Sequence, residues 1–470
     1  MNAEQGNANN RQEFDVVIIG VGQAGKPLAT AFAEAGHSTA IVERNLVGGS
    51  CINFGCTPTK AMIASANVAY LTKQAEEYGV RVKDSTVDLR KVYERKEKIV
   101  KSFRGGVKKS LEEQENLTLI YGHARFTDKM AIEVDLNEGK GKTYLKAGKV
   151  FINTGARPTV PDLKGLEHID YLTASSIQDL TEVPTELLVV GGGYIGLEFA
   201  QMFSRFGAKV TIVERGTQLL SREDEDVANA LKEILEGEGI TVLLEAEVAE
   251  FSQSAGQNQA KVKTKDGSKE VFFSKCLLAL GVTPNTDDLG LEAAGIETDE
   301  KGYVQVNGFM ETSQPGVYAF GDVKGGPAFT HVSYDDFRIV KGHLLENRSR
   351  LAKDRLLPYT VFTNPQLGRV GLNENQAKDK GIDYRIARMP MEQVARAIET
   401  GETRGFMKVL ISKSDDQILG ASILGLEGGE IMSALQMAMI GLVPYTTIRD
   451  SMFAHPTLAE SLNNLFGTVD

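Results

Sequence analysis

The sequence contains only three cysteines and no long apolar run. Three cysteines are too few for a structural disulfide framework, so a disulfide formed here is more consistent with catalysis. A membrane-spanning helix needs about 18 or more consecutive apolar residues, and no such run occurs. The chain also lacks an excess of positive charge, because its net charge is −11 at pH 7. That charge argues against nucleic acid and anionic membranes as partners.

The first residues of the chain are polar and lack the apolar core of a signal peptide or presequence. We expect residues 1–12 to be a disordered tail, and we expect a cytoplasmic location. At 470 residues the chain is too long for one hydrophobic core, which predicts two to four domains.

Two segments, Phe14–Glu43 and Glu186–Glu214, repeat one pattern. Each predicts an apolar strand, a G-x-G-x-x-G turn, an amphipathic helix and a second strand that ends in glutamate. The glycines of the two turns are Gly20, Gly22 and Gly25, then Gly191, Gly193 and Gly196. Both Glu43 and Glu214 follow the first glycine of their turn by 23 positions (43 − 20 and 214 − 191).

Each position of this pattern has its own physical reason. The first glycine makes a tight turn, the second lets the backbone approach a pyrophosphate, and the third allows the helix to pack closely on the strand. The glutamate accepts hydrogen bonds from ribose hydroxyls. One such turn alone is weak support, but here the whole unit occurs twice in the same register. Two dinucleotide sites predict an electron relay between two dinucleotides.

The rest of the chain has a different character. The segment Pro284–Arg350 contains a short strand that ends at Gly321 and Asp322, and a new alternating pattern begins at Pro358. Strand-like and helical patterns alternate from there, which indicates a separate C-terminal α+β domain.

The segment GGSCINFGCTPTK places Cys51 five positions before Cys56. In an ideal helix, Cα atoms five residues apart are about 8.6 Å apart, whereas a disulfide needs less than about 7 Å. A Cys51–Cys56 bridge therefore needs a distorted turn, which Gly55 and Pro58 favour. Zinc is disfavoured because no second Cys or His cluster completes four ligands. Two unrelated buried thiols remain the alternative.

Near its end the chain contains His455 and Glu460 in FAHPTLAE. A histidine with a carboxylate partner can act as a general acid–base, and a thiol leaving group needs a proton donor. The alternative is a surface histidine near a helix. The His455–Pro456 bond is a candidate cis peptide.

These motifs, in this order, resemble the FAD-dependent pyridine nucleotide-disulfide oxidoreductases, which include dihydrolipoyl dehydrogenase, glutathione reductase and mercuric reductase. The resemblance extends from Glu13 to Phe466 and includes INTGARP (Ile152–Pro158), LLALGVTPN (Leu277–Asn285) and YAFGD. It implies an α/β fold with two Rossmann-type dinucleotide-binding domains and a C-terminal α+β dimerisation domain. The implied boundaries are 13–155 and 284–353 for the FAD-binding domain, 156–283 for the NAD(P)-binding domain and 354–470 for the dimerisation domain.

The resemblance also implies catalytic roles. Cys51 resembles the interchange thiol that meets substrate, and Cys56 the charge-transfer thiol that faces the flavin. Lys60 and Glu198 would pair beside the flavin ring, and Tyr194 resembles an aromatic lid over it, with a core aromatic as the alternative.

Further positions resemble the family's cofactor-binding residues. Asp322 would bind the FAD ribityl chain, and Glu43 the adenosine ribose. The remaining implied contacts are the six turn glycines, Gly49, Lys60, Thr154, Gly155, Tyr194, Glu214, Arg215, Gly281 and Gly321. His455 and Glu460 would reach the active site from the partner subunit of a homodimer. Cys276 matches no functional position and is predicted to be a core thiol.

Several family members can be compared with this sequence. The helix after Gly25 has no arginine, which disfavours glutathione and trypanothione reductases. GQAGKPLA, QPGVYAFGDV and ARAIETGETRGFMKV resemble mercuric reductase, yet the chain ends without that enzyme's cysteine pair. Residues Phe329–Val340 resemble the reactive-chlorine-resistance flavoproteins, which are proposed to reduce copper.

We therefore predict an FAD-dependent NAD(P)H oxidoreductase that passes electrons through Cys51 and Cys56 to a disulfide, a metal ion or another acceptor, small or protein-borne. It would be mercuric-reductase-like, with dihydrolipoyl dehydrogenase as the alternative and a non-catalytic redox sensor or scaffold as an alternative of another class. NADH is the preferred donor because Glu214 would repel a 2′-phosphate, whereas Arg215 could bind one and allow NADPH. No resident metal is predicted.

Overall fold

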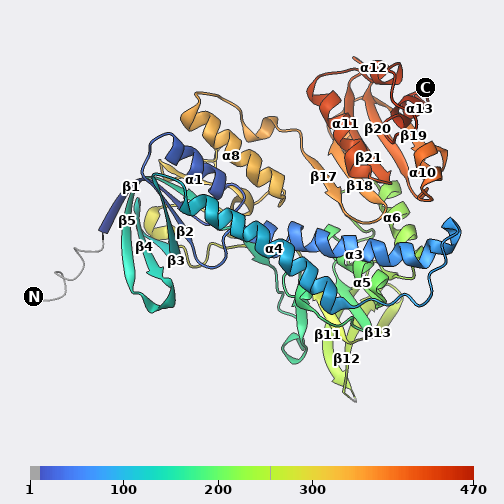
Figure 1. Ribbon diagram of the computed structural model, residues 1–470, viewed down its shortest axis with the longest axis horizontal. Helices are drawn as coiled ribbons and strands as arrows, with labels where there is room; N and C mark the ends of the chain where they lie inside the picture. The colour runs from blue at the N-terminus through green and yellow to red at the C-terminus, as the bar shows by residue number, and fades with distance from the viewer. Residues whose placement is uncertain (1–10, 255, 470) are drawn as a thin grey trace, which may run out of the picture. The chain divides into compact units, whose positions relative to one another are not determined.

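The computed structural model describes residues 11–254 and 256–469 (Figure 1). The chain divides into two compact units, each built from three segments. The first unit comprises Met1–Ala61, Glu94–Thr159 and Gly281–Arg355, and the second comprises Met62–Tyr93, Val160–Leu280 and Leu356–Asp470. Residues 1–10 of the predicted tail lie outside the described residues, and residues 11 and 12 belong to the first strand.

The first unit contains a sheet with a parallel core. Its parallel strands follow the order β16, β5, β1, β2, β3, and β4 pairs antiparallel with both β3 and β5. The bounds are β1 Arg11–Ile19, β2 Thr39–Glu43, β3 Leu117–Asp128, β4 Ala131–Leu136, β5 Lys142–Ile152 and β16 Val317–Ala319. A two-stranded ladder joins β6 (Ala156–Pro158) to β15 (Val282–Pro284).

Alternation along β1 buries both faces of this sheet. Val16 and Ile18 lie in a core with α1 (Gly25–Glu34) and α8 (Thr330–Leu345), two helices that lie together on one face (Figure 1). Val17 and Ile19 belong to a second core on the opposite face. Successive side chains of a strand point to opposite faces, so an unbroken apolar strand must be covered on both.

The second unit contains the second predicted Rossmann segment. A parallel sheet has the strand order β10, β9, β8, β14, β7. Its strands are β7 Tyr171–Thr173, β8 Glu186–Val190, β9 Lys209–Val213, β10 Thr241–Leu243 and β14 Lys275–Leu278. Helices α5 (Tyr194–Phe206) and α6 (Glu225–Gly237) follow β8 and β9, and strands β11 Glu247–Ser254, β12 Gln257–Thr264 and β13 Gly267–Phe273 form an antiparallel sheet.

The second unit also holds a C-terminal antiparallel sheet, in the order β17, β18, β21, β20, β19. Its strands are β17 Pro358–Val361, β18 Gln366–Gly371, β19 Tyr384–Pro390, β20 Phe406–Ser412 and β21 Ile418–Gly425. Helix α11 (Gly428–Ile440) packs on this sheet (Figure 1). The other helices are α2 Gly49–Asn53, α3 Cys56–Gln74, α4 Leu89–Glu112, α7 Leu291–Ala294, α9 Glu374–Asp379, α10 Ala395–Glu399, α12 Tyr445–Arg449 and α13 Ser461–Phe466.

Within the described ranges, no helix combines the length and the apolar character needed to cross a membrane. Cys276 is fully buried in β14, and burial raises the pKa of its thiol. The prediction that Cys276 is a core thiol is therefore confirmed.

Candidate functional site

The two cysteines, both in the first unit, flank a break between two helices. Cys51 lies in α2, and Cys56 is the first residue of α3. Phe54 ends α2 with a φ of −140° that is not helical. The helix is thus interrupted between the cysteines, as a short Cys51–Cys56 separation requires.

The thiols interact with each other and with a hydroxyl from far along the chain. A hydrogen bond with Cys56, and then burial, raise the pKa of the Cys51 thiol, and the hydroxyl of Thr330 opposes this rise. The Cys56 Sγ lies 3.2 Å from the Thr330 Oγ1. Thr330 is the first residue of α8, and helix N-termini stabilise thiolates. Sequence reasoning missed Thr330, although the segment Phe329–Val340 had been singled out for its resemblance.

The first glycine turn is closed by a single asparagine. A Cβ on Gly20, whose φ is +103°, would lie 2.4 Å from the Asn153 carbonyl oxygen, and one on Gly22 would lie 2.5 Å from its Oδ1. That Oδ1 accepts a 2.9 Å hydrogen bond from the Gly25 N–H. A Cβ on Gly49 would lie 2.8 Å from the Gly22 Cα. Only glycine fits at these positions, and Asn153 is a second residue that sequence reasoning missed.

The second glycine turn has the same backbone but different surroundings. Gly191 has a φ of +114°, and a Cβ there would lie 2.4 Å from the Ala279 carbonyl oxygen. A Cβ on Gly196 would lie 2.3 Å from the Gly191 carbonyl oxygen. Around Gly193, in contrast, no heavy atom of the described residues lies within 4 Å of the added Cβ.

The two strand-end glutamates bind their turns in the same way. The Glu43 carboxylate accepts 2.9 Å hydrogen bonds from the N–H groups of Val21 and Asn45. The Glu214 carboxylate accepts bonds of 2.6 and 2.7 Å from Gly192 and Gly216. Burial raises the pKa of Glu43, while these backbone N–H groups oppose the rise. Both carboxylates therefore lie beside a glycine turn and bind its backbone N–H groups. The side chain of Arg215, the residue after Glu214, is exposed.

The motif INTGARP meets the last five residues of LLALGVTPN, 281–285, in the first unit. The Thr154 hydroxyl donates to the Asn285 carbonyl at 2.9 Å, and the Asn285 amide donates to the Thr154 carbonyl at 2.9 Å. The Asn285 N–H also donates to the Gly155 carbonyl, and the Thr159 N–H to that of Gly281. These bonds bring two predicted cofactor-binding segments together.

The Gly321–Asp322 segment follows β16. The Gly321 N–H donates to the buried carboxylate of Asp336 at 2.9 Å, which also binds Lys324 at 3.2 Å. Burial raises the pKa of Asp322, Lys324 lowers it and Asp336 raises it. Asp336 is thus a structural carboxylate that holds the turn presenting Asp322, and sequence reasoning had not singled it out.

The predicted acid–base pair forms within the second unit. The Nδ1 of His455 lies 2.9 Å from the Glu460 carboxylate, and the His455–Pro456 peptide bond is cis, as its sequence suggested. The His455 side chain is 70% exposed, so its Nε2 side is available to a reactant.

Lys60 and Glu198 belong to different units. Lys60 is half-buried in α3, whereas Glu198 is 4% exposed in α5, the helix that begins at Tyr194. The backbone N–H of Phe362 donates to Glu198 at 2.9 Å. The Lys60–Glu198 pair and the lid role of Tyr194 stay predictions.

Comparison with known proteins decides the family. The profile described as "Pyridine nucleotide-disulphide oxidoreductase" matches residues 14–336, and the profile of the corresponding dimerisation domain matches residues 357–466. The chain belongs to this family.

Individual members of the family cover nearly the whole chain. It is 36% identical over 461 residues to the probable pyridine nucleotide-disulfide oxidoreductase RclA of Escherichia coli K12, covering 97% of this chain and 99% of that protein. It is 33% identical over 462 residues to a mercuric reductase of Lysinibacillus sphaericus, covering 98% and 83% of the two chains. A dihydrolipoyl dehydrogenase of Geobacillus stearothermophilus is 33% identical over 450 residues, covering 95% and 94%.

Solved structures agree with these relatives. The HOCl-induced flavoprotein disulfide reductase RclA of Escherichia coli superposes with a TM-score of 0.88 at 35% identity, covering 97% of this chain and all (100%) of that one. Its Cu(II) complex gives a TM-score of 0.89 at 35% identity, covering 97% and 99%. The predicted fold class of this pyridine nucleotide-disulphide oxidoreductase is therefore confirmed.

As a member of this family the protein is an NAD(P)H-dependent flavoprotein oxidoreductase, and the family's cofactor is FAD. The first turn fits that cofactor. The closely spaced backbone at Gly20, Gly22 and Gly49 leaves no room for side chains, and α1 begins at the turn with its N–H groups. Such a turn binds a pyrophosphate, and Glu43 suits the ribose hydroxyls.

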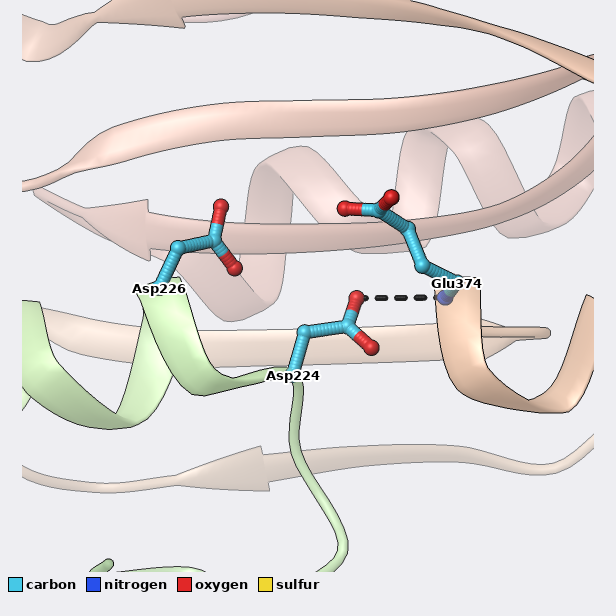
Figure 2. Close-up of side chains that lie close together, drawn as sticks. All are labelled: Asp224, Asp226 and Glu374. Atoms are coloured by element: carbon cyan, nitrogen blue, oxygen red, sulfur yellow. Dashed lines mark hydrogen bonds between the residues drawn. The ribbon is translucent and has the colours of Figure 1, made fainter. Parts of the chain in front are cut away.

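One carboxylate cluster of the oxidoreductase could be mistaken for a metal site. Asp224, Asp226 and Glu374 point toward one another (Figure 2). The ammonium group of buried Lys408 lies 2.9, 2.7 and 3.0 Å from these three carboxylates. The cluster therefore binds a lysine of the protein itself, and it serves as an internal ion-pair network.

Proposed function

We propose that this enzyme moves two electrons from NADH through FAD to a Cys51–Cys56 disulfide, and that the resulting dithiol reduces the final acceptor. In the first half-reaction, NADH, one proton and the disulfide become NAD⁺ and two thiols. In the second, the dithiol returns to the disulfide as the acceptor gains two electrons. The observation that carries the proposal is the thiol pair at the α2–α3 break, in contact with Thr330 at the start of α8.

Bound FAD supplies a carrier that accepts a hydride and passes two electrons to a disulfide. Cys51 meets the acceptor and Cys56 faces the flavin, where the Thr330 hydroxyl and the α8 N-terminus stabilise its thiolate. Lys60 and Glu198 pair at the flavin ring, and a half-buried charge without a partner would be costly there. Tyr194, at the start of α5, covers the flavin until nicotinamide replaces it.

We propose a homodimer in which His455 and Glu460 complete the active site of the partner subunit. The match of residues 357–466 to a dimerisation domain supports this arrangement. His455 protonates the leaving thiolate of a disulfide acceptor, while Glu460 fixes its tautomer through Nδ1. A cytoplasmic location completes the proposal, since a dithiol is kept reduced there.

Mixing Cys56→Ser and His455→Ala, two variants expected to be inactive with a disulfide acceptor, tests the shared site with that acceptor. In a mixed dimer one site carries both lesions and the other carries none. Random reassociation makes about half of the dimers mixed, so activity should recover to roughly a quarter of the wild-type value. If each chain completed its own site, mixing would restore no activity.

The acceptor separates two candidate functions. Relatives named as a mercuric reductase and as a Cu(II) complex of RclA support a metal ion as the acceptor. The His455–Glu460 pair favours a disulfide such as lipoamide, because reducing Cu(II) needs no proton donor.

Steady-state kinetics with lipoamide and Cu(II), on wild type and His455→Gln, distinguish these acceptors. If a disulfide is the acceptor, kcat/KM for lipoamide should exceed that for Cu(II) and should fall about 10²- to 10⁴-fold in the variant. If a metal ion is the acceptor, Cu(II) should be reduced faster, and the variant should retain that rate. Inactivity with both, despite bound FAD and reduction by NADH, would favour the sensor alternative.

A further inference from the structure

One face of α5 holds a turn of the C-terminal sheet. Glu198, Gln201 and Arg205 are spaced so that they share this face. All three are 4% exposed. They contact residues 362–365, which connect β17 to β18 and which we call the 362–365 turn.

Gln201 binds this turn through both ends of its side-chain amide. Its Oε1 accepts from the Asn364 N–H at 2.8 Å, and its Nε2 donates to the Asn364 carbonyl at 2.8 Å. Two residues earlier, the Phe362 N–H donates to the Glu198 carboxylate at 2.9 Å. Gln201 therefore fixes the backbone of Asn364 while the same short turn delivers a donor to Glu198.

A second layer of charged groups fixes the orientation of the Gln201 amide. Its Nε2 also donates to the Glu238 carboxylate at 3.2 Å. Burial opposes ionisation of Glu238, but hydrogen bonds and charge from Arg205 and Arg404 leave its pKa below the ordinary value. An ionised carboxylate accepts only, so the NH₂ end of Gln201 must face Glu238 and its oxygen must face the Asn364 N–H.

Arg205 and Arg404 also bind the 362–365 turn. Arg205 and Arg404 donate to the Asn364 carbonyl at 3.1 and 3.2 Å, and they share Glu238 at 2.7 Å each. The ring of Tyr70 lies 3.9 Å from the Arg205 guanidinium carbon. Gln201 nevertheless holds the Asn364 N–H as well as its carbonyl, and it is the group nearest in sequence to Glu198.

We infer that Gln201 is a positioning residue for hydride transfer, because it pins the 362–365 turn so that the Phe362 N–H orients the Glu198 carboxylate. The inference rests on the proposed function, which places Glu198 at the flavin. If the turn moves, the buried Glu198 carboxylate loses the Phe362 N–H as a donor. A buried carboxylate that loses a donor reorients toward other donors. Gln201 itself touches neither flavin nor nicotinamide in this role.

Gln201→Met keeps the length of the side chain and removes both amide contacts. The measurement is anaerobic stopped-flow reduction of the flavin by saturating NADH, normalised to bound FAD, together with the unfolding temperature. We expect the limiting rate to fall about tenfold, the effect of one lost buried hydrogen bond, with FAD content unchanged. If Gln201→Met does not fold, Gln201→Ala serves instead, because it leaves space for water to satisfy the Asn364 N–H and carbonyl. Water does not hold the turn in place as a side chain does, so this variant should show the same fall in the limiting rate.

A matched control is Gln178→Met. Gln178 is also buried in the second unit, and its amide donates to the Ala174 carbonyl at 2.6 Å. This variant should lose stability as Gln201→Met does and keep the wild-type limiting rate per FAD. A wild-type limiting rate in Gln201→Met, or an equal fall in Gln178→Met, would overturn the inference.

A double-mutant cycle tests whether Gln201 acts through Glu198. Glu198→Gln should slow flavin reduction, and adding Gln201→Met should slow it no further, because the two changes disturb one interaction. Rate losses that multiply in the double variant would contradict a positioning role. A wild-type rate in Glu198→Gln alone would instead show that the proposed placement of Glu198 at the flavin is wrong.

Discussion

The first glycines of the two turns have similar backbone conformations, with φ of +103° at Gly20 and +114° at Gly191, but the turns differ in what surrounds the middle glycine. In the first turn, the Asn153 side chain fills the space beside Gly22 and binds the Gly25 N–H. The Asn153 Nδ2 also donates a hydrogen bond to the Phe320 carbonyl at 3.1 Å. In the second turn Ala279 takes the place of Asn153, and no heavy atom of the described residues lies within 4 Å of a Cβ added at Gly193.

We propose that this difference suits the two turns to two kinds of ligand. Asn153 follows β5 and hydrogen-bonds to Ile19 of β1 and to Phe320, so in the proposed function this turn is pre-organised for the FAD that stays bound. The second turn lacks such a polar tie among its described neighbours and suits a nucleotide that enters and leaves at each turnover. The first region also carries Cys51 and Cys56, whereas the second only delivers electrons in the proposed scheme.

The largest effect should come from Cys56→Ser, which separates the two regions. Turnover with any acceptor should fall at least about 10³-fold, because the electron exit is lost while flavin reduction by NADH persists. Anaerobic spectra provide the measurement: the long-wavelength thiolate–flavin band should be absent in Cys56→Ser and present without reductant in Cys51→Ser. A band that persists in Cys56→Ser would mean that the two thiols are assigned in the wrong order.

Alanine in the third glycine of each turn compares the regions directly. Gly25→Ala and Gly196→Ala place a Cβ 2.4 and 2.3 Å from a backbone oxygen, so either turn must shift. Overpacking costs about 1–3 kcal/mol, which corresponds to ten- to hundredfold weaker binding. Gly25→Ala should lose FAD during purification, whereas Gly196→Ala should stay yellow and bind NADH weakly. Equal FAD loss in both would contradict the assignment of the turns.

Asn153→Ala tests the tie that distinguishes the first turn. It removes the acceptor of the Gly25 N–H and the donor to the Phe320 carbonyl, and an unsatisfied buried group costs about 1–3 kcal/mol. The Kd for FAD, measured by flavin fluorescence after removal of the cofactor, should rise about ten- to hundredfold. The KM for NADH, measured with FAD in excess, should stay within a factor of about two of wild type.

Glu214→Ala tests which nicotinamide cofactor the second turn prefers. Wild type should prefer NADH, since the carboxylate accepts ribose hydroxyls and repels a 2′-phosphate. The variant should change the ratio of kcat/KM values in favour of NADPH by about tenfold, with Arg215 available to the phosphate. A wild-type kcat/KM for NADPH equal to that for NADH would contradict the predicted preference.

The smallest effect concerns the pH dependence of Glu43. Because burial raises its pKa above 4.5, its ionised form is lost as pH falls through a value higher than an exposed glutamate would show. The ionised form is the one that accepts ribose hydroxyls, so FAD affinity should weaken as pH falls through that raised pKa. Fluorescence titrations across acid pH should show this slope in wild type and a flatter one in Glu43→Gln.

Much of the fold and site could be predicted from local patterns. The first strand–turn–helix–strand unit could be predicted because its signals, the glycines from Gly20 to Gly25 and the acid Glu43, lie within one short segment. The structure forms this unit as expected. The interruption between Cys51 and Cys56 likewise follows from Gly55 and the short spacing. The roles of these residues in catalysis stay predictions, since binding and reaction act on molecules outside the chain.

Other contacts could not be predicted because their partners are far apart in sequence. Thr330 follows Cys56 by 274 positions, and Asn153 follows Gly25 by 128. Gln201 and Asn364 are separated by 163 positions. A single polar residue at such a distance carries no periodic signal, so only folding shows which hydroxyl or amide reaches which turn.

The sequence by itself determined the two strand–turn–helix–strand units, the acids that end their second strands and the candidate redox pair, because these features depend on backbone sterics and on spacing within short segments. Tertiary structure alone decided that Thr330 meets Cys56, that Asn153 fills the first turn and that Gln201 grips Asn364. Those contacts depend on how sheets and helices pack, which brings hydrogen-bond donors and acceptors together from segments that are not neighbours along the chain.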